Sequence, residues 1–286
     1  MNEVDILKDI ELFVLDMDGT FYLGNDIIDG ALKFLEAVKK AGKRYMFFTN
    51  NSSMSSDKYI EKLAGMNCFI GKDQIMTSGD VMIRFLKSSF SGKSVYLLGT
   101  RPLIDSFIKA GIDLFNLENE DALDPESKKK RPDIVVVGFD KDLDYRKLSN
   151  ACTYIREGAL FLATHLDINC PMPDGFIPDC GAICKAIELS TGVKPRFVGK
   201  PFKETVDMVV DATNVQKEKI AFVGDRLYTD VATGVNNGAK GILVLSGECQ
   251  MTDVEKSDVK PDGIYDSIYE MGKILDEKNY ILELSN

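Results

Sequence analysis

Short apolar runs alternate with amphipathic stretches near both ends of the chain. Leu12 to Leu15 and Tyr45 to Phe48 are apolar runs, and residues 30–41 between them place Leu32, Leu35 and Val38 at helical spacing. Runs of this kind predict buried strands, whereas the 3.6-residue period predicts a helix. The same order recurs later in the chain, in residues 219–223, 229–237 and 241–245. Repeated strand, helix, strand units predict a three-layer α/β/α core with a parallel sheet covered on both faces.

The middle of the chain contains strand and helix patterns of its own. They lie in residues 94–98, 103–110, 134–137, 143–157 and 160–163. Turn-rich passages flank this region at residues 77–79 and 171–175, where Gly, Pro and Ser mark breaks between elements. We therefore predict an inserted smaller α/β domain, residues 79–178, within a discontinuous core formed by residues 1–78 and 179–286.

Composition narrows the class of protein. The 286 residues are 44% hydrophobic and 28% charged, which is ordinary for a globular protein of two domains. A formal net charge of −10 argues against nucleic acid and anionic membrane as partners. We expect a cytoplasmic protein, because no apolar stretch approaches the ~20 residues of a membrane span and the N-terminus lacks signal-peptide features. Six scattered cysteines without a C-x-x-C pair predict reduced thiols.

Two carboxylates follow the first predicted strand. Asp16 and Asp18 are two residues apart, so in extended backbone they point to the same side. Gly19 then lets the chain leave the strand in a tight loop. The carboxyl ends of strands are where open α/β sheets bind ligands, so this pair is a candidate site.

Three further polar segments follow predicted core strands. Residues 49–53, Thr-Asn-Asn-Ser-Ser, offer hydroxyl and backbone N–H groups that suit phosphate oxygens. Lys200 lies in a Gly-Lys-Pro loop after the predicted strand 196–198, and Asp225 and Asp230 follow the strand 219–223. Each segment alone is a common turn or helix cap, but four polar strand ends in this order favour one shared site.

The carboxylates predict a metal ion. Asp16, Asp18 and Asp225 together form a hard, oxygen-rich pocket that suits Mg²⁺. Converging carboxylates repel one another unless a cation lies between them, so we predict magnesium as the cofactor. Cys180 and Cys184 are four residues apart, but with His165 as the single histidine a zinc site would be short of ligands, and packing accounts for them better.

These motifs resemble the haloacid dehalogenase (HAD) superfamily over nearly the whole chain. The matching positions are Asp16-x-Asp18-Gly19-Thr20, Thr49, Lys200 and Gly224-Asp225-x-x-x-x-Asp230. The motif spacing and the large insertion look like the NagD-like, or para-nitrophenyl phosphatase, subgroup, whose members carry a C2-type α/β cap over a Rossmann-like core. Residues 135–140 and 163–167 look like that cap. His165 stands where relatives usually have the Asn of Thr-Asn-x-Asp.

The resemblance implies a magnesium-dependent phosphomonoester hydrolase for small phosphorylated metabolites such as sugar phosphates or nucleotides. Asp16 would be the nucleophile that forms an aspartyl-phosphate, and Asp18 the general acid and base. The implied phosphate-binding residues are Thr49, the Asn50 amide and Lys200. The implied metal ligands are Asp16, the backbone carbonyl of Asp18, and Asp225, with Asp230 orienting Asp225 or a metal-bound water. Asn51 and His165 would be substrate contacts, and the cap is a candidate homodimer surface.

Several alternatives remain open at this stage. The chain could be a catalytically weak HAD-fold protein that binds ligands or regulates. Dehalogenases on this fold use neither the second aspartate nor a metal, so Asp18 and Asp225 favour phosphate esters. A phosphonate hydrolase would need a Schiff-base lysine from the cap, and nothing singles out Lys87, Lys93 or Lys109. A serine or cysteine hydrolase using His165 is disfavoured because Gly-x-Ser-x-Gly is absent.

Overall fold

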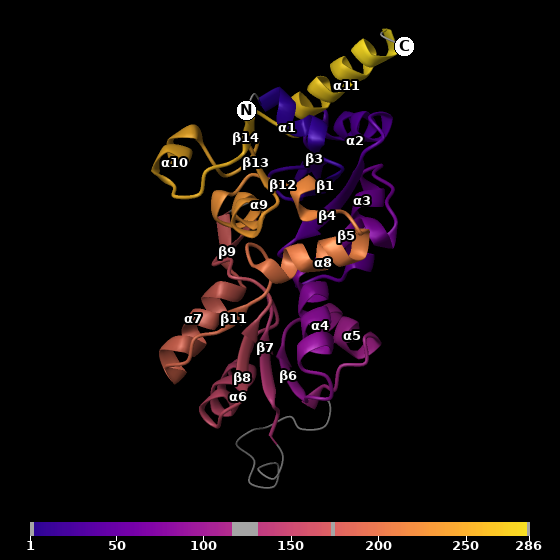
Figure 1. Ribbon diagram of the computed structural model, residues 1–286. Coiled ribbons are helices and arrows are strands. Elements are labelled where there is room, and N and C mark those ends of the chain that lie inside the picture. The colour runs from indigo at the N-terminus through magenta and orange to yellow at the C-terminus, as the bar shows by residue number, and fades with distance from the viewer. Residues whose placement is uncertain (1–2, 116–130, 173–174, 285–286) are drawn as a thin grey trace. The chain divides into compact units, whose positions relative to one another are not determined.

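The computed structural model describes residues 3–115, 131–172 and 175–284, and the chain forms two compact units. The first unit comprises Met1–Thr49, Tyr59–Met76 and Lys200–Asn286. The second comprises Asn50–Lys58 and Thr77–Gly199. The predicted α/β core with an inserted smaller α/β domain is confirmed (Figure 1).

The first unit is built on a six-stranded sheet with the order β14-β13-β12-β1-β4-β5. The strands are β1 (Leu12–Leu15), β4 (Arg44–Thr49), β5 (Ile75–Thr77), β12 (Ile220–Gly224), β13 (Lys240–Val244) and β14 (Gly263–Tyr265). Strand β1 lies between β4 and β12 and is parallel to both. All four of its residues are buried, which explains why it reads as an uninterrupted apolar run. The carboxyl ends of these three strands therefore lie at one edge of the sheet.

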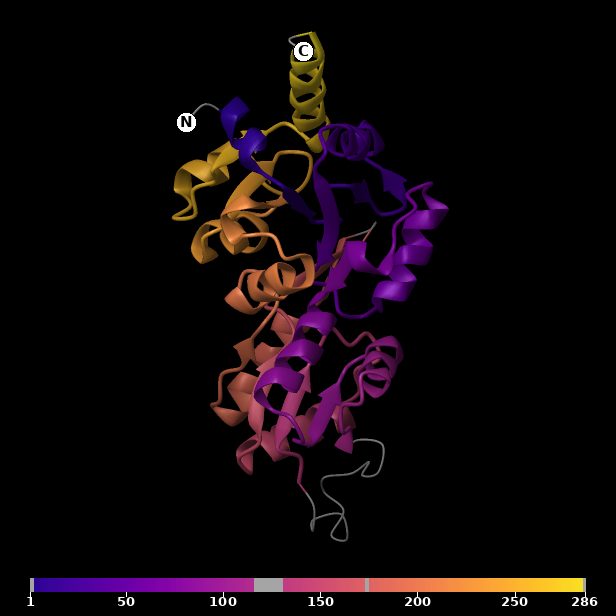
Figure 2. The same ribbon diagram turned by 45° about the vertical axis from the view of Figure 1, so that its right-hand side comes forward.

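Helices pack around this sheet, and several of them also pack against one another. They are α1 (Glu3–Asp9), α2 (Ala31–Lys40), α3 (Ser56–Gly65), α8 (Lys203–Thr213), α9 (Ala232–Asn237), α10 (Met251–Lys256) and α11 (Ile268–Leu284), with short 3₁₀ turns at Lys72–Gln74 and Lys217–Lys219 and a π-helical turn at Leu227–Val231. Helix α2 packs against α11 (Figure 2), and α8 packs against α9. The ring of Phe34 in α2 packs edge to face against that of Phe13 in β1, with 5.6 Å between the ring centroids. A two-residue hairpin, β2 (Tyr22–Leu23) and β3 (Asp26–Ile27), follows the Asp-x-Asp segment.

The second unit has a smaller parallel sheet with the order β11-β8-β7-β6. Its elements are α4 (Ser78–Ser89), β6 (Val95–Leu98), α5 (Arg101–Lys109), β7 (Ile134–Val137), α6 (Tyr145–Arg156), β8 (Leu160–Ala163), β9 (Asn169–Met172), β10 (Gly175–Pro178), α7 (Cys180–Thr191) and β11 (Arg196–Phe197). The strands and helices predicted for the middle of the chain are present within a few residues of their expected bounds.

The return to the core comes later in the chain than we predicted. We expected the core to hold all of residues 1–78 and the return crossing to lie at 178–179. The structure instead assigns Asn50–Lys58 and residues up to Gly199 to the second unit. Apolar side chains of α7, Ile183 and Ile187 among them, pack into the core of that unit. The turn-rich passage 171–175 lies in the antiparallel hairpin β9–β10, although Pro173 and Asp174 are outside the described residues.

Residues 196–198 were also wrongly predicted as a core strand. Strand β11 pairs in parallel with β8 of the second unit. The N–H groups of Val198 and Gly199 extend that ladder by donating to the carbonyls of Ala163 and Thr164. Lys200 is therefore the first residue of the core after this crossing, because the smaller sheet holds the chain up to Gly199.

Two predictions from the sequence concerned the state of the cysteines and the presence of a membrane-spanning segment. All six cysteines are free thiols, as predicted, and five of them are buried. Among the residues that the structure describes, none of the helices combines the length and the apolar character needed to cross a bilayer.

Candidate active site

Lys200 lies between two carboxylates in the first unit. Its Nζ is 2.6 Å from Asp16 Oδ1 and 2.5 Å from Asp230 Oδ1, and it donates to the carbonyl of Phe48 at 3.4 Å. Only 3% of Lys200 is exposed. Burial alone would lower the pKa of Lys200, but the two carboxylates outweigh burial and hold that pKa above its ordinary value. The ammonium group is therefore charged and fixed beside Asp16.

Three carboxylates converge around this lysine. Asp16, Asp225 and Asp230 each offer an oxygen within 4.8 Å of the others. They meet because Asp16 and Asp225 follow the adjacent parallel strands β1 and β12, whose ladder continues with the Asp16 N–H donating to the Val223 carbonyl at 2.8 Å. Three of the four predicted strand ends, those bearing Asp16, Lys200 and Asp225, thus form one site.

The carboxylate of Asp225 is suited to a cation. Its Oδ2 accepts a hydrogen bond from the Glu248 N–H at 2.7 Å. Its Oδ1 is buried and has no hydrogen-bond partner among the described residues. Burial, and after it the charge of Asp16, raises the pKa of Asp225 to about 6. Because an unpartnered buried carboxylate oxygen is costly, this donor set fits a hard divalent cation.

Asp18 is not part of the cluster formed by the carboxylates of Asp16, Asp225 and Asp230. Its backbone bridges to Tyr22, and the Gly19 N–H donates to the Tyr22 carbonyl at 2.9 Å. Burial raises the pKa of Asp18 to about 6, with Lys62 lowering and Asp16 raising it. A carboxyl group that titrates near neutral pH can both donate and accept a proton, as general acid and base catalysis requires.

Sequence reasoning missed some of the residues around the site. Lys62 Nζ lies 3.9 Å from the centroid of the Tyr22 ring, and no sequence pattern relates these two positions. Ser246 donates to the carbonyl of Gly19 at 2.9 Å, next to the Glu248 contact with Asp225. The segment 246–248 could have been found, because it also consists of polar and small residues directly after an apolar strand.

The other predicted site residues are divided between the two units. Thr49 is the last residue of β4, 6% exposed, at the same sheet edge as Asp16. Asn50, Asn51 and His165 belong to the second unit. There Asn51 Oδ1 accepts from the N–H and hydroxyl of Ser53, at 3.0 and 2.7 Å, which closes a local turn. His165 is completely buried in that unit and faces Asp167 and Asp179 rather than solvent.

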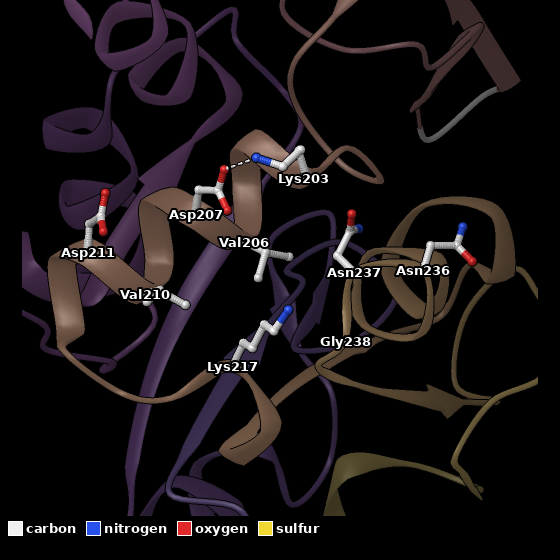
Figure 3. A pocket seen from close by; sticks show the side chains of 9 residues that line it. All are labelled: Lys203, Val206, Asp207, Val210, Asp211, Lys217, Asn236, Asn237 and Gly238. Carbon is white, nitrogen blue, oxygen red and sulfur yellow. Dashed lines mark hydrogen bonds and ion pairs between the residues drawn. The ribbon is translucent and has the colours of Figure 1, made fainter.

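A separate hollow of about 660 Å³ lies between α8 and the end of α9 (Figure 3). None of the predicted site residues lines it. Lys203 at its edge is paired with Asp207 at 2.5 Å. Asn237 donates to the carbonyl of Pro201 at 2.9 Å, so this wall supports the loop that carries Lys200.

Comparisons with known proteins agree with this geometry. A family model described as haloacid dehalogenase-like hydrolase matches residues 13–113, and a HAD-hydrolase-like model matches residues 197–271. A protein named acid sugar phosphatase from Staphylococcus aureus (strain MRSA252) is 32% identical over 255 residues, covering 89% of this chain and 94% of its own. The chain belongs to the haloacid dehalogenase-like hydrolases.

Solved structures of similar proteins cover nearly the whole chain. A 4-nitrophenylphosphatase from Thermotoga maritima is 43% identical, with a TM-score of 0.86 over 94% of this chain and 98% of its own. NagD from Escherichia coli K-12 is 29% identical, with a TM-score of 0.80 over 91% of this chain and 98% of its own. The NagD-like placement within the HAD-like hydrolases, predicted from the motifs, is therefore confirmed.

Proposed function

We propose that this chain is a magnesium-dependent phosphomonoester hydrolase that acts on small phosphorylated metabolites through an aspartyl-phosphate on Asp16. The observation that carries the proposal is the placement of Lys200 and of the unpartnered Asp225 oxygen around Asp16. Similarity to proteins named acid sugar phosphatase and 4-nitrophenylphosphatase supports the same reaction class. Sugar phosphates are the preferred substrate class on this ground, and nucleotides come second.

Asp16, Asp225 and the backbone carbonyl of Asp18 would hold the metal. All three offer hard oxygen ligands, for which Mg²⁺ is the natural cation. When bound, Mg²⁺ would neutralise the charge of the phosphoryl oxygens. Asp230 serves a different purpose in this proposal: its Oδ1 binds Lys200 and its Oδ2 accepts from the Arg226 N–H at 3.2 Å, so it holds the lysine in place.

The protein side chains then carry the reaction. An oxygen of Asp16 attacks phosphorus, and the bond from phosphorus to the leaving oxygen breaks while Asp18 gives that oxygen its proton. Asp18 next takes a proton from the water that attacks the aspartyl-phosphate, which frees Asp16 and releases orthophosphate. Thr49, the Asn50 amide and Lys200 bind the transferring phosphoryl group, and their charge and hydrogen bonds stabilise the transition state.

The second unit is, in this proposal, a C2-type cap that selects the substrate. A phosphonate-cleaving role is less favoured, because Lys93 and Lys109 of this unit are exposed and paired with Asp133 and Asp57 at 2.9 and 3.3 Å. Homodimerisation through this unit and a cytoplasmic location stay predictions, and sedimentation and fractionation can test them.

The first experiment is a phosphate-release assay on para-nitrophenyl phosphate, sugar phosphates and nucleoside monophosphates. We expect release in Mg²⁺ and its loss in EDTA, because the carboxylate cluster needs a cation before it can accept a phosphate anion. Restored activity on adding Mg²⁺ back controls for unfolding in EDTA. The absence of release from every substrate would favour the ligand-binding alternative instead.

Gly19 allows a second test of the site. Its φ is +81°, and a Cβ there would lie 2.3 Å from Asp225 Oδ2. We expect Gly19→Ala to weaken Mg²⁺ affinity roughly tenfold or more, because the methyl group displaces a metal ligand. Titration of Mg²⁺ against phosphatase rate or protein fluorescence measures this change.

Gly24 supplies the matched control. It has a φ of +61°, and a Cβ at this position would have no heavy atom within 4 Å, so Gly24→Ala carries the backbone cost of about 1–2 kcal/mol without touching Asp225. We expect its Mg²⁺ affinity to match the wild type. Equal Mg²⁺ affinities in the two alanine variants would contradict the close approach of Gly19 to Asp225.

A further inference from the structure

A charged cluster is buried in the second unit, outside the carboxylate site. His165 is fully buried, and Asp167 and Asp179 are 5% and 4% exposed. Nδ1 of His165 lies 3.4 Å from Asp167 Oδ2, and Nε2 lies 3.5 Å from Asp179 Oδ1. Each ring nitrogen therefore lies within ion-pair distance of a different carboxylate, although neither makes a hydrogen bond within the described residues.

The cluster connects a helix end to the Asn50 side chain. Asp179 is the N-cap of α7, and its Oδ1 accepts from the Cys180 N–H at 2.6 Å. At the other end, Asp167 Oδ1 accepts a hydrogen bond from Asn50 Nδ2 at 3.4 Å. The contacts thus run without a break from the start of α7 through Asp179, His165 and Asp167 to Asn50.

Asn50 and the loop that follows it make further contacts within the second unit. A Cβ at position 199 would lie 2.5 Å from the Thr164 carbonyl oxygen and 2.8 Å from Asn50 Oδ1, so glycine lets the chain pass close to the Asn50 side chain. The backbone carbonyl of Asn50 accepts from the Ser78 hydroxyl. Two residues on, Ser52 Oγ accepts from the Phe139 N–H at 2.9 Å and lies 3.0 Å from the Thr164 hydroxyl. The second unit therefore holds Asn50 and its loop in one orientation.

Charge explains why a histidine suits this position. Two buried carboxylates near one another repel unless a positive group lies between them. Burial by itself lowers the pKa of His165, but Cys180, Asp179 and Asp167 outweigh burial and raise that pKa to about 9. Two carboxylates and one imidazolium leave a net charge of −1 on the three side chains, whereas a neutral residue at position 165 would leave −2.

We propose that His165, held between Asp167 and Asp179, is a positioning residue that orients the Asn50 amide for the phosphoryl group. This role rests on the proposed function, because it assumes that Asn50 binds phosphate. His165 acts through Asp167 and does not itself touch substrate. The same three side chains are also close enough to hold a metal ion, and the experiment distinguishes that occupant.

The test compares His165→Gln with the double variant His165→Gln, Asp179→Asn. The single variant leaves two carboxylates without a cation, and the double variant restores the net charge of −1. We expect His165→Gln to raise KM and the orthophosphate inhibition constant roughly tenfold or more, since small misplacements of binding groups are costly. The double variant should recover most of that loss. Lys93→Gln, an exposed change in the same unit, is the matched control and should behave as wild type.

A nuclear magnetic resonance readout separates this proposal from the proposed function. The ¹⁵N side-chain amide signal of Asn50, assigned by its absence in Asn50→Asp, should move in His165→Gln and return toward the wild-type position in the double variant. This comparison holds even if the wild type hydrolyses no phosphate ester. Should His165→Gln fail to fold, Asp179→Asn, which removes one of the two carboxylates beside His165 and keeps the contact of Asp167 with Asn50, tests the same positioning through the Asn50 signal.

Three results would overturn the proposal. One is a folded His165→Gln protein with unchanged KM, inhibition constant and Asn50 signal. Another is a double variant as impaired as the single one, which would exclude the charge argument. The third is a zinc ion bound to the wild-type protein and lost in His165→Gln, measured by elemental analysis, which would make the cluster a metal site.

Discussion

Replacement of Asp16 by Asn should abolish phosphate release, with a loss in kcat of at least about 10⁴-fold, the scale seen when a covalent nucleophile is removed. The carboxamide keeps the size of the side chain but is a poor nucleophile toward phosphorus. It also loses the ionic contact with Lys200 at 2.6 Å. Initial rates with para-nitrophenyl phosphate and mass spectrometry of acid-quenched protein measure turnover and the phosphorylated intermediate.

Asp207→Asn is the control for this change. Asp207 is an exposed aspartate paired with Lys203, so its variant makes the same substitution away from the site and should keep wild-type rates. A folded Asp16→Asn protein with wild-type turnover, or one that still gives the phosphorylated species, would exclude Asp16 as the nucleophile.

Lys200→Met should destabilise the folded protein more than any other single substitution proposed for the site. It removes a buried ammonium group and leaves the carboxylates of Asp16 and Asp230 facing each other without it. Breaking a buried ion pair from one side costs about 3–5 kcal/mol, so we expect a loss of that size in the free energy of unfolding. Denaturant titration of the metal-free protein measures it, and phosphate release should be lost as well.

Two further variants show whether charge is the cause. Lys200→Met with Asp230→Asn should recover much of the stability but not the activity, because one uncompensated carboxylate is gone while the phosphate-binding ammonium is still missing. Lys203→Met removes an exposed lysine of which 69% of the side chain is accessible, and should cost about 0–1 kcal/mol. Similar losses in the two single variants would contradict the buried ion-pair arrangement.

The fold was predictable where strands are buried on both faces. Leu12 to Leu15 read as a strand because a parallel central strand has no solvent face and so carries no polar positions. The crossing between the units was not predictable in the same way. Strand β11 has only two residues, too few for any periodicity, and its assignment depends on pairing with β8, which lies more than thirty residues earlier.

The candidate site was predictable to a similar degree. Asp16 and Asp225 come together because each follows a core strand and parallel strands end at one edge, a rule that sequence order alone can apply. Lys200 follows a strand of the second unit, so this rule does not explain its ion pair with Asp16. The contact of Lys62 with Tyr22 depends on how α3 is placed, and the pairing of His165 with Asp179 depends on the start of α7. Such contacts between distant segments leave no local pattern in the chain.

The division of the chain between its units limits how its specificity could be engineered. The second unit is formed from two separate segments, Asn50–Lys58 and Thr77–Gly199, and the shorter one begins directly after Thr49. Grafting only residues 77–199 from a relative would leave Ser52 facing a foreign partner in place of Phe139 and Thr164. Exchange of the smaller domain between homologues therefore requires transplanting the Asn50–Lys58 segment together with the longer one, as a matched pair.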